Sequence, residues 1–346
     1  MYKTWTKTFF KFLFFICISI ISFIYVIDPY QHYRISSWYD IMDDEKQRDI
    51  TPGIAKNAFY ESAIIGSSMA ENFSPYQMDK LFDTKSVKLC ISGITAYEIN
   101  ELLQTTFNSN PNLKNIILAL DATSLSGEIK RSRNSELPLY LYDNNYFNDI
   151  KYLLNLDTFK DSIKMLENRG KSKNDLDTLW YWKDRYTFSK DITEDSYAQH
   201  LQKPFNDLDN FSLKNMKDNF NTNILPFIKK YPNTKFYIFY PPYSYLTYKL
   251  FAKQQWLNNF LNFKKYVYDV TLAHNNTKIF DFQCDLNITK NLNLYRDISH
   301  YSANINSYIL ESIYKNNFLT TSSNLEKCSN TIKDSFEDDI TKSFHK

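Results

Sequence analysis

The chain has 346 residues, of which 43% are hydrophobic and 17% aromatic, enough for a sizeable core in one large domain or two modest ones. Its 41 lysines and arginines oppose 39 aspartates and glutamates, so the formal net charge is +2. The two signs are interspersed, and the sequence has no basic stripe of the kind that follows a phosphate backbone. The composition predicts a globular protein that does not bind nucleic acid.

Residues 1–30 predict a cytoplasmic stub and a membrane anchor. Three lysines precede or begin an apolar stretch that is uninterrupted over 12–27 and, counted from Phe9, just long enough to cross a bilayer. A cleaved secretory signal is the alternative, but the stretch is long for a signal peptide and no small-x-small cleavage site precedes Asp28. We therefore expect an uncleaved signal anchor that contacts the lipid bilayer through residues 9–27.

Charge flanking the anchor predicts its orientation. Lysines lie before the apolar stretch, and four acidic residues follow it, namely Asp40, Asp43, Asp44 and Glu45. The positive-inside rule then places the N-terminus in the cytoplasm. We expect a single-pass protein of the inner (cytoplasmic) membrane, with residues 31–57 as a juxtamembrane linker and the remainder in the periplasm or outside the cell.

The four cysteines give little functional information. Cys17 lies in the apolar stretch, so at most one disulfide can form among Cys90, Cys284 and Cys328. No Cys-x-x-Cys pair or Cys/His metal spacing occurs. The sequence predicts no metal site and no organic cofactor.

Short apolar segments alternate with amphipathic ones through the rest of the chain. Ser74 followed by Pro75 predicts the start of a helix, and Thr95 with Glu98 forms a capping box at the start of another. Five buried strands are expected, at 62–66, 86–92, 115–123, 235–244 and 278–282.

Continuous apolar strands separated by helices are typical of an α/β fold with a doubly wound, mostly parallel sheet. We expect this domain over 58–319, with a large helical insertion at about 128–232. The insertion, which includes an aromatic and polar segment at 177–188, is either a cover for the sheet or a cap that forms a substrate platform. Residues 320–346 are expected to be a polar tail, solvated or disordered.

One of only five glycines stands at the end of the first expected strand, where Gly66 precedes Ser67 and Ser68. Open parallel sheets bind ligands at the carboxyl ends of their strands. A glycine there permits a tight turn and a close backbone approach, and the turn would expose a serine hydroxyl. The alternative is that these serines only cap the following helix.

A serine nucleophile needs a base, and one histidine stands out among His32, His200, His274, His300 and His345. Only His300 has a carboxylate three residues before it, Asp297, and an amphipathic helix after it. Such a carboxylate can hold imidazole Nδ1 while Nε2 faces a serine. The alternative is an acidic helix start, favoured by the helix dipole, beside a surface histidine.

These motifs together resemble those of the SGNH (GDSL-like) hydrolase superfamily, and Gly93 stands where that superfamily has an oxyanion-hole N–H. The resemblance covers roughly 58–126 and 233–316. It implies a three-layer, flavodoxin-like fold in which Ser68 is the nucleophile, His300 the base and Asp297 its orienting acid. The backbone N–H groups of Ser68 and Gly93 would bind the oxyanion.

One position departs from the pattern. The superfamily's Gly-x-Asn-Asp block after the third strand is absent, and Asp121 stands at the corresponding strand end. An ionised carboxylate would repel an oxyanion, so Asp121 either binds a substrate hydroxyl, stays protonated through burial, or marks lost activity. Ser67, which falls where many relatives have aspartate, is expected to line the site with Asp121 and Tyr243.

The anchor, the Asp-Pro-Tyr at 28–30, the Gly-Ser-Ser form and the "FYPPYS" segment resemble envelope proteins of the DltD and AlgJ/AlgX-like type. The resemblance implies a serine esterase or O-acyltransferase that acts on acyl esters of a cell-envelope polysaccharide, with a multi-spanning acyltransferase as a possible partner in transfer. The alternatives are a catalytically inert SGNH-fold protein that binds or presents an envelope glycan, and a structural membrane protein.

Overall fold

A five-stranded, all-parallel sheet forms the centre of the protein, in the order β2-β1-β3-β4-β5. The computed structural model describes residues 2–37, 39–42, 46–133, 137–169, 175–202 and 211–343. The five expected strands are confirmed, with bounds β1 Ser62–Gly66, β2 Ser86–Cys90, β3 Asn115–Ala119, β4 Lys235–Tyr240 and β5 Thr277–Asp281. Since β2 and β3 lie on opposite sides of β1, the strand order reverses between β1 and β3, where open α/β sheets bind ligands.

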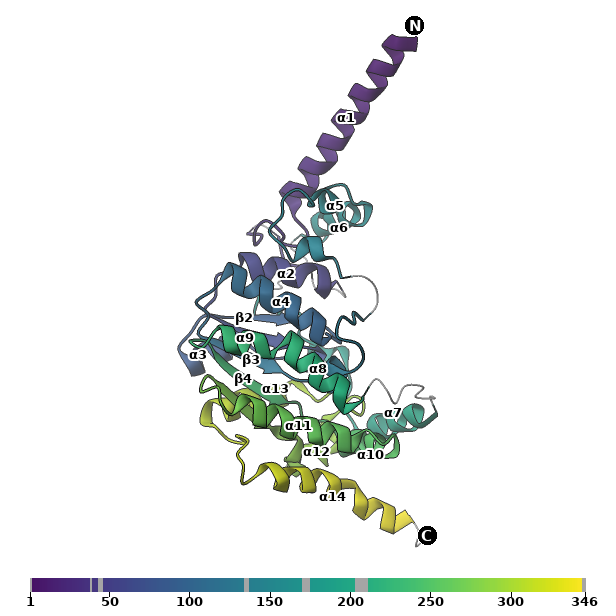
Figure 1. Cartoon of the computed structure of the whole chain (residues 1–346). Coiled ribbons are helices and arrows are strands. Elements are labelled where there is room, and N and C mark those ends of the chain that lie inside the picture. Colours follow the sequence, from purple (N-terminus) through teal and green to yellow (C-terminus); the bar gives the residue numbers. More distant parts are fainter. Residues whose placement is uncertain are drawn as a thin grey trace.

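Helices cover both faces of the sheet, which makes the fold the expected doubly wound α/β class (Figure 1). On one face α2, α4, α8 and α11 pack against one another in that order, and on the other α3 packs against α13. The helices are α1 Tyr2–Ile27, α2 Gln47–Asn57, α3 Pro75–Phe82, α4 Ala96–Ser109, α5 Ile150–Leu153, α6 Leu156–Glu167, α7 Lys190–Gln202, α8 Leu213–Asn223, α9 Leu225–Lys230, α10 Tyr245–Lys253, α11 Leu257–Thr271, α12 Leu286–Thr289, α13 Ala303–Lys315 and α14 Leu325–Ser343.

Helix α1 projects from the rest of the molecule (Figure 1). Over Thr4–Ile27 its length and composition suffice to cross a membrane, as those of an anchor or a signal sequence would. Its last two turns, however, belong to the folded domain. Ile24 and Ile27 are buried, and the ring of Phe23 lies 5.4 Å from that of Phe159 on α6.

The segment expected to be a linker, 31–57, differs from that expectation. The buried Asp28 carboxylate accepts the backbone N–H groups of three residues just after α1, namely His32, Tyr33 and Arg34. Residues 47–57 form helix α2, which packs on β2 and α4. A Cβ on Gly53 would lie 2.2 Å from the Tyr30 carbonyl oxygen, so the two segments touch through their backbones. The sequence hid this helix because Pro52 and Gly53 stand inside it.

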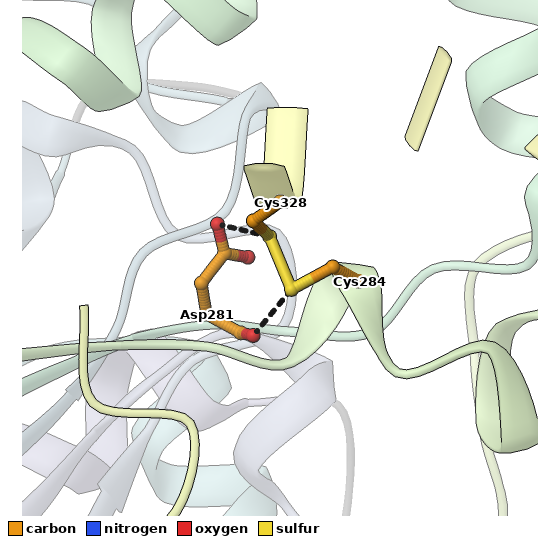
Figure 2. A group of neighbouring side chains, drawn as sticks. All are labelled: Asp281, Cys284 and Cys328. Atoms are coloured by element: carbon orange, nitrogen blue, oxygen red, sulfur yellow. Dashed lines mark hydrogen bonds between the residues drawn. A yellow bond between two sulfur atoms is a disulfide. The ribbon is translucent and has the colours of Figure 1, made fainter. Parts of the chain in front are cut away.

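The C-terminal segment is also more ordered than expected. Residues 325–343 form α14, in which Leu325, Cys328 and Ile332 are buried at helical spacing, and residues 344–346 lie outside the described residues. A disulfide joins Cys328 to Cys284, which follows β5 (Figure 2). The segment is polar in composition as expected, but it forms a helix that two buried apolar side chains, Leu325 and Ile332, and the disulfide hold to the domain.

Different parts of the insertion at 128–232 lie in different places: one part covers the sheet, and another lies close to the serine turn. Helices α5 and α6 lie against α1, while α8 and α9 join the helical layer over the sheet. Within the part of the insertion that the structure describes, the segment around Trp182 instead reaches the turn that follows β1. This last segment lies near Ser68, and so does Arg133, whose guanidinium lies against Gly93.

Candidate active site

Ser68 lies in a tight 3₁₀ turn, Ser68–Ala70, directly after β1. The Ser67 hydroxyl caps this turn by accepting the Met69 N–H at 3.2 Å. From the other side, Tyr301 Oη and Asn306 Nδ2 both donate to the Met69 carbonyl oxygen, at 3.1 and 2.8 Å. The turn is therefore fixed by its own first serine and by residues at the start of α13.

Gly66 has a different role from the one its place beside the serines suggested. A Cβ at this position would lie 2.7 Å from the Ala119 Cβ and 2.9 Å from the Ala70 Cβ, closer than real Cβ atoms approach. The glycine therefore lets β1 pack against β3 and against the serine turn. Close approach to a reacting carbonyl is not needed to explain it.

A Gly66→Ala substitution tests this packing role. We expect the added methyl to lower the free energy of unfolding by about 1–3 kcal/mol, because neither alanine can move without shifting β3 or the turn. Denaturant titration of the purified protein in detergent measures the change. A variant as stable as the parent would show that the site has free space.

The predicted serine, histidine and aspartate come together at the carboxyl edge of the sheet. His300 Nε2 lies 2.8 Å from Ser68 Oγ, and His300 Nδ1 lies 2.7 Å from Asp297 Oδ2. Asp297 Oδ1 also accepts the backbone N–H groups of Ser299 and His300, each at 2.8 Å. The carboxylate thus fixes the ring that faces the serine, although 232 residues separate Ser68 from His300.

The electrostatics of Asp297 suit its position. Burial raises the pKa of its carboxyl, but hydrogen bonds from the His300 ring and from two backbone N–H groups, together with the imidazolium charge, outweigh burial and lower the pKa to about 2. Asp297 is therefore ionised at neutral pH and accepts the Nδ1 proton of His300. With that proton on Nδ1, Nε2 is the nitrogen that faces the Ser68 hydroxyl.

The two backbone N–H groups that the sequence predicted as oxyanion donors, those of Ser68 and Gly93, follow β1 and β2 at the carboxyl edge of the sheet. Among the described residues, the N–H groups of Ser68 and Gly93 have no hydrogen-bond acceptor. Gly93 has a φ of +60°, and the Arg133 guanidinium occupies the space that a side chain would need there. Gln47 of α2 accepts the neighbouring Ser92 N–H and donates to Glu71, so it links the two loops.

Asp121 belongs to a buried network beneath the serine turn. Its two oxygens accept the hydroxyl protons of Ser67 and of Tyr243, the latter at 2.8 Å, and only 3% of Asp121 is exposed. Both hydroxyls in turn accept backbone N–H groups, of Met69 and Ala122. Burial raises the pKa of Asp121, and the two hydroxyl hydrogen bonds oppose the rise.

This network changes the interpretation of the departure at Asp121. Ser67, Asp121 and Tyr243 were expected to line the site, but all three are buried and bonded to one another. Binding of a substrate hydroxyl by Asp121 has no support, because only 3% of the residue is exposed. The carboxylate instead holds Ser67, which caps the nucleophile turn.

Sequence reasoning missed Trp182, which forms a wall of the site. Its ring lies 5.7 Å from that of His300, edge to face, and its Nε1 donates to Glu71. The Arg296 guanidinium lies 4.0 Å from the Trp182 ring centroid and 3.6 Å from that of Tyr186. The aromatic composition of 177–188 was a signal, but nothing in the sequence gave its partner.

One cluster outside this site has donor atoms of the kind that bind metals. Asp281, Cys284 and Cys328 place their ligand atoms within 4.8 Å of one another (Figure 2). The two sulfurs are joined in a disulfide, however, and Asp281 Oδ2 pairs with the buried Lys264 Nζ at 2.5 Å. Disulfide sulfurs are not thiolates, so this donor set does not fit a metal ion.

The fold and the site define an α/β protein with a Ser–His–Asp arrangement at the sheet's switch point, compatible with the SGNH superfamily that the sequence resembles. No family model matches the chain, and no curated protein matches it. A solved structure described as "a putative platelet activating factor from Streptococcus pneumonia" is similar to it, with 13% identity and a TM-score of 0.40, over 79% of this chain and 92% of that one. We therefore assign the protein class from the sheet and the Ser–His–Asp geometry alone, because a TM-score of 0.40 at 13% identity is too low to support the assignment.

Proposed function

We propose that this protein is a membrane-anchored, extracytoplasmic serine esterase or O-acyltransferase that acts on acyl esters of a cell-envelope polysaccharide. The observation that carries the proposal is the hydrogen-bonded chain from Ser68 through His300 to Asp297. Burial of Ile24 and Ile27 in the domain supports an anchor that is retained, because cleavage before Asp28 would remove both side chains.

The geometry supports an acyl-enzyme mechanism. Ser68 Oγ attacks the ester carbonyl carbon while its proton passes to His300 Nε2, and Asp297 stabilises the imidazolium. The carbonyl oxygen becomes an oxyanion that accepts the N–H groups of Ser68 and Gly93. The imidazolium then protonates the departing alkoxide, and water or a sugar hydroxyl, deprotonated by the same nitrogen, releases the acyl group from Ser68.

Labelling with a fluorophosphonate tests the nucleophile. We expect the full-length protein in detergent to form one adduct, which peptide mass spectrometry assigns to Ser68, and the Ser68→Ala variant to form none. Ser323→Ala, an exposed serine before α14, is the control and should label like the parent. The proposal fails if the parent never labels or if Ser68→Ala labels equally.

Product analysis separates transfer from hydrolysis. With an acylated donor alone, a hydrolase releases free carboxylic acid, and an added polysaccharide leaves that rate unchanged. A transferase instead moves the acyl group to the polysaccharide.

The second candidate, an inert glycan-binding protein, is favoured by the exposed Tyr186 ring beside Trp182, because aromatic rings stack on sugars. Glycan binding by a parent protein that never labels would support it.

A further inference from the structure

Exposed apolar side chains gather on α6, α5 and the turns that flank α5, and both helices pack against α1. Phe147 is 96% exposed, Tyr146 79% and Leu156 67%. We call these three and the exposed Ile150, Leu154 and Ile163 the α5–α6 patch. Large apolar side chains that gather on one surface of a protein mark contact with another protein or with a membrane.

The patch lies on α6, on α5 and on the turns that flank α5. Leu156 and Ile163 are two turns apart on α6, Ile150 lies on α5, and Phe147 and Leu154 lie just before and just after α5. The opposite sides of these helices are buried, with Tyr152 at 0% and Met165 at 6% exposed. Helix α6 therefore has an inner face against the protein and an outer apolar face.

The position of α6 along α1 gives the depth of the patch. Phe159 of α6 contacts Phe23, which lies four residues before the end of α1 at Ile27. At 1.5 Å per residue, the contact between Phe159 and Phe23 lies about 6 Å along the helix axis from the end of α1. Amphipathic helices in a bilayer interface bury their apolar faces by about 5–10 Å.

The apolar part of α1, counted from Phe9, is no longer than the hydrocarbon core is thick, so a span that begins there brings the domain to the lipid surface. From Phe9 to Ile27 the helix measures about 28 Å at 1.5 Å per residue, against a hydrocarbon thickness of about 30 Å. The Ile27 end must then lie at the bilayer surface, with α6 beside it. Because Asp157 and Lys160 on α6 carry exposed charges, α6 can enter the bilayer only as deep as the headgroups.

We propose that the α5–α6 patch inserts into the interface of the bilayer that α1 crosses. The lipid is its occupant because α5 and α6 pack against α1 near the end of that helix, where Tyr25 and Val26 remain exposed. Lys151, Lys160 and Lys164 flank the apolar stripes and can extend to the headgroups. The inference rests on α1 as a membrane span and is independent of the chemistry at Ser68.

A fluorescent label at Phe147 tests this contact. The full-length Phe147→Cys variant, labelled with an NBD group, is reconstituted into phosphatidylcholine–phosphatidylglycerol vesicles, with lipids that carry a nitroxide near the top of the acyl chain as quencher. Leu272→Cys is the matched control: Leu272 is 66% exposed and directly follows α11, in the connection to β5, the strand at the far edge of the sheet from α2. The unsubstituted protein, treated in the same way, corrects for labelling of Cys17.

We expect the label at 147 to show blue-shifted emission and to be quenched by the nitroxide lipid, and the label at 272 to show neither. Equal, water-like emission at both positions would overturn the proposal. A blue shift at 147 without lipid quenching would also overturn it, in favour of a second copy of the chain as occupant. Failure of the protein to float with the vesicles would overturn the span itself, and the fluorophosphonate labelling of Ser68 would be unaffected by any of these outcomes.

Discussion

Replacing His300 by alanine is expected to lower the rate of ester turnover by about 10⁴- to 10⁶-fold, the loss that serine hydrolases show when their base is removed. The loss should fall on kcat, because Nε2 accepts the Ser68 proton at 2.8 Å and no other described base lies within hydrogen-bonding reach of Ser68 Oγ. Turnover of p-nitrophenyl acetate by the purified full-length protein measures it.

The control for this prediction is His274→Ala. His274 lies before β5, at the end of the sheet opposite to the triad, so its loss should leave turnover unchanged. Asp297→Asn gives a second comparison: it keeps the size of the side chain but favours the wrong imidazole tautomer, and about 10⁴-fold of activity should be lost. A His300→Ala variant within tenfold of the parent would exclude His300 as the base.

Loss of the disulfide is expected to have the largest effect on stability. Cys284 and Cys328 are 44 residues apart, and closing a loop of this length stabilises the folded state by about 4 kcal/mol in the chain-entropy model. For Cys328→Ser we therefore expect the melting temperature to fall by about 6 °C, given the unfolding entropy of a domain of this size. Thermal melts of the detergent-solubilised protein measure the shift.

Dithiothreitol treatment of the parent should reproduce the effect of Cys328→Ser, and the two together should not add. Cys17→Ser is the matched cysteine variant, since Cys17 lies in α1 and has no disulfide partner. If Cys328→Ser melts with the parent, the bond does not stabilise the folded state. A bond of this kind persists in an oxidising compartment, which agrees with a domain outside the cytoplasm.

Local sequence signals were sufficient to predict the sheet. All five strands are short apolar runs, each buried over most of its length, and Ser74 and the Thr95–Glu98 pair cap α3 and α4 as expected. His300 and Asp297 could be paired because they stand three residues apart. Whether they lie beside Ser68 depends on the order of the strands in the sheet, and local sequence patterns do not determine that order. Their proximity to Ser68 was predicted from the resemblance to a known family.

The errors share one physical cause, which is contact between segments far apart in the chain. The role of Gly66 depends on Ala119 of β3, and that of Asp121 depends on Tyr243 in the loop after β4. Helix α2 contains Pro52 and Gly53 and is stabilised by packing rather than by intrinsic propensity. No local pattern in 46–57 or 325–332 indicated the segments that bury Ile50, Ile54, Cys328 and Ile332.

The packed joint between α1 and α2 has a consequence for how the protein meets its substrate. If residues 31–57 were a flexible chain, their root-mean-square end-to-end distance would be about 30 Å, and the domain could move that far from the membrane. The bonds of Asp28 and the close contact at Gly53 remove that freedom. If α1 spans the membrane as proposed, Ser68 would lie at a fixed distance from the lipid surface. A polymer or acyl donor would then have to diffuse to Ser68, because the domain could not move toward it.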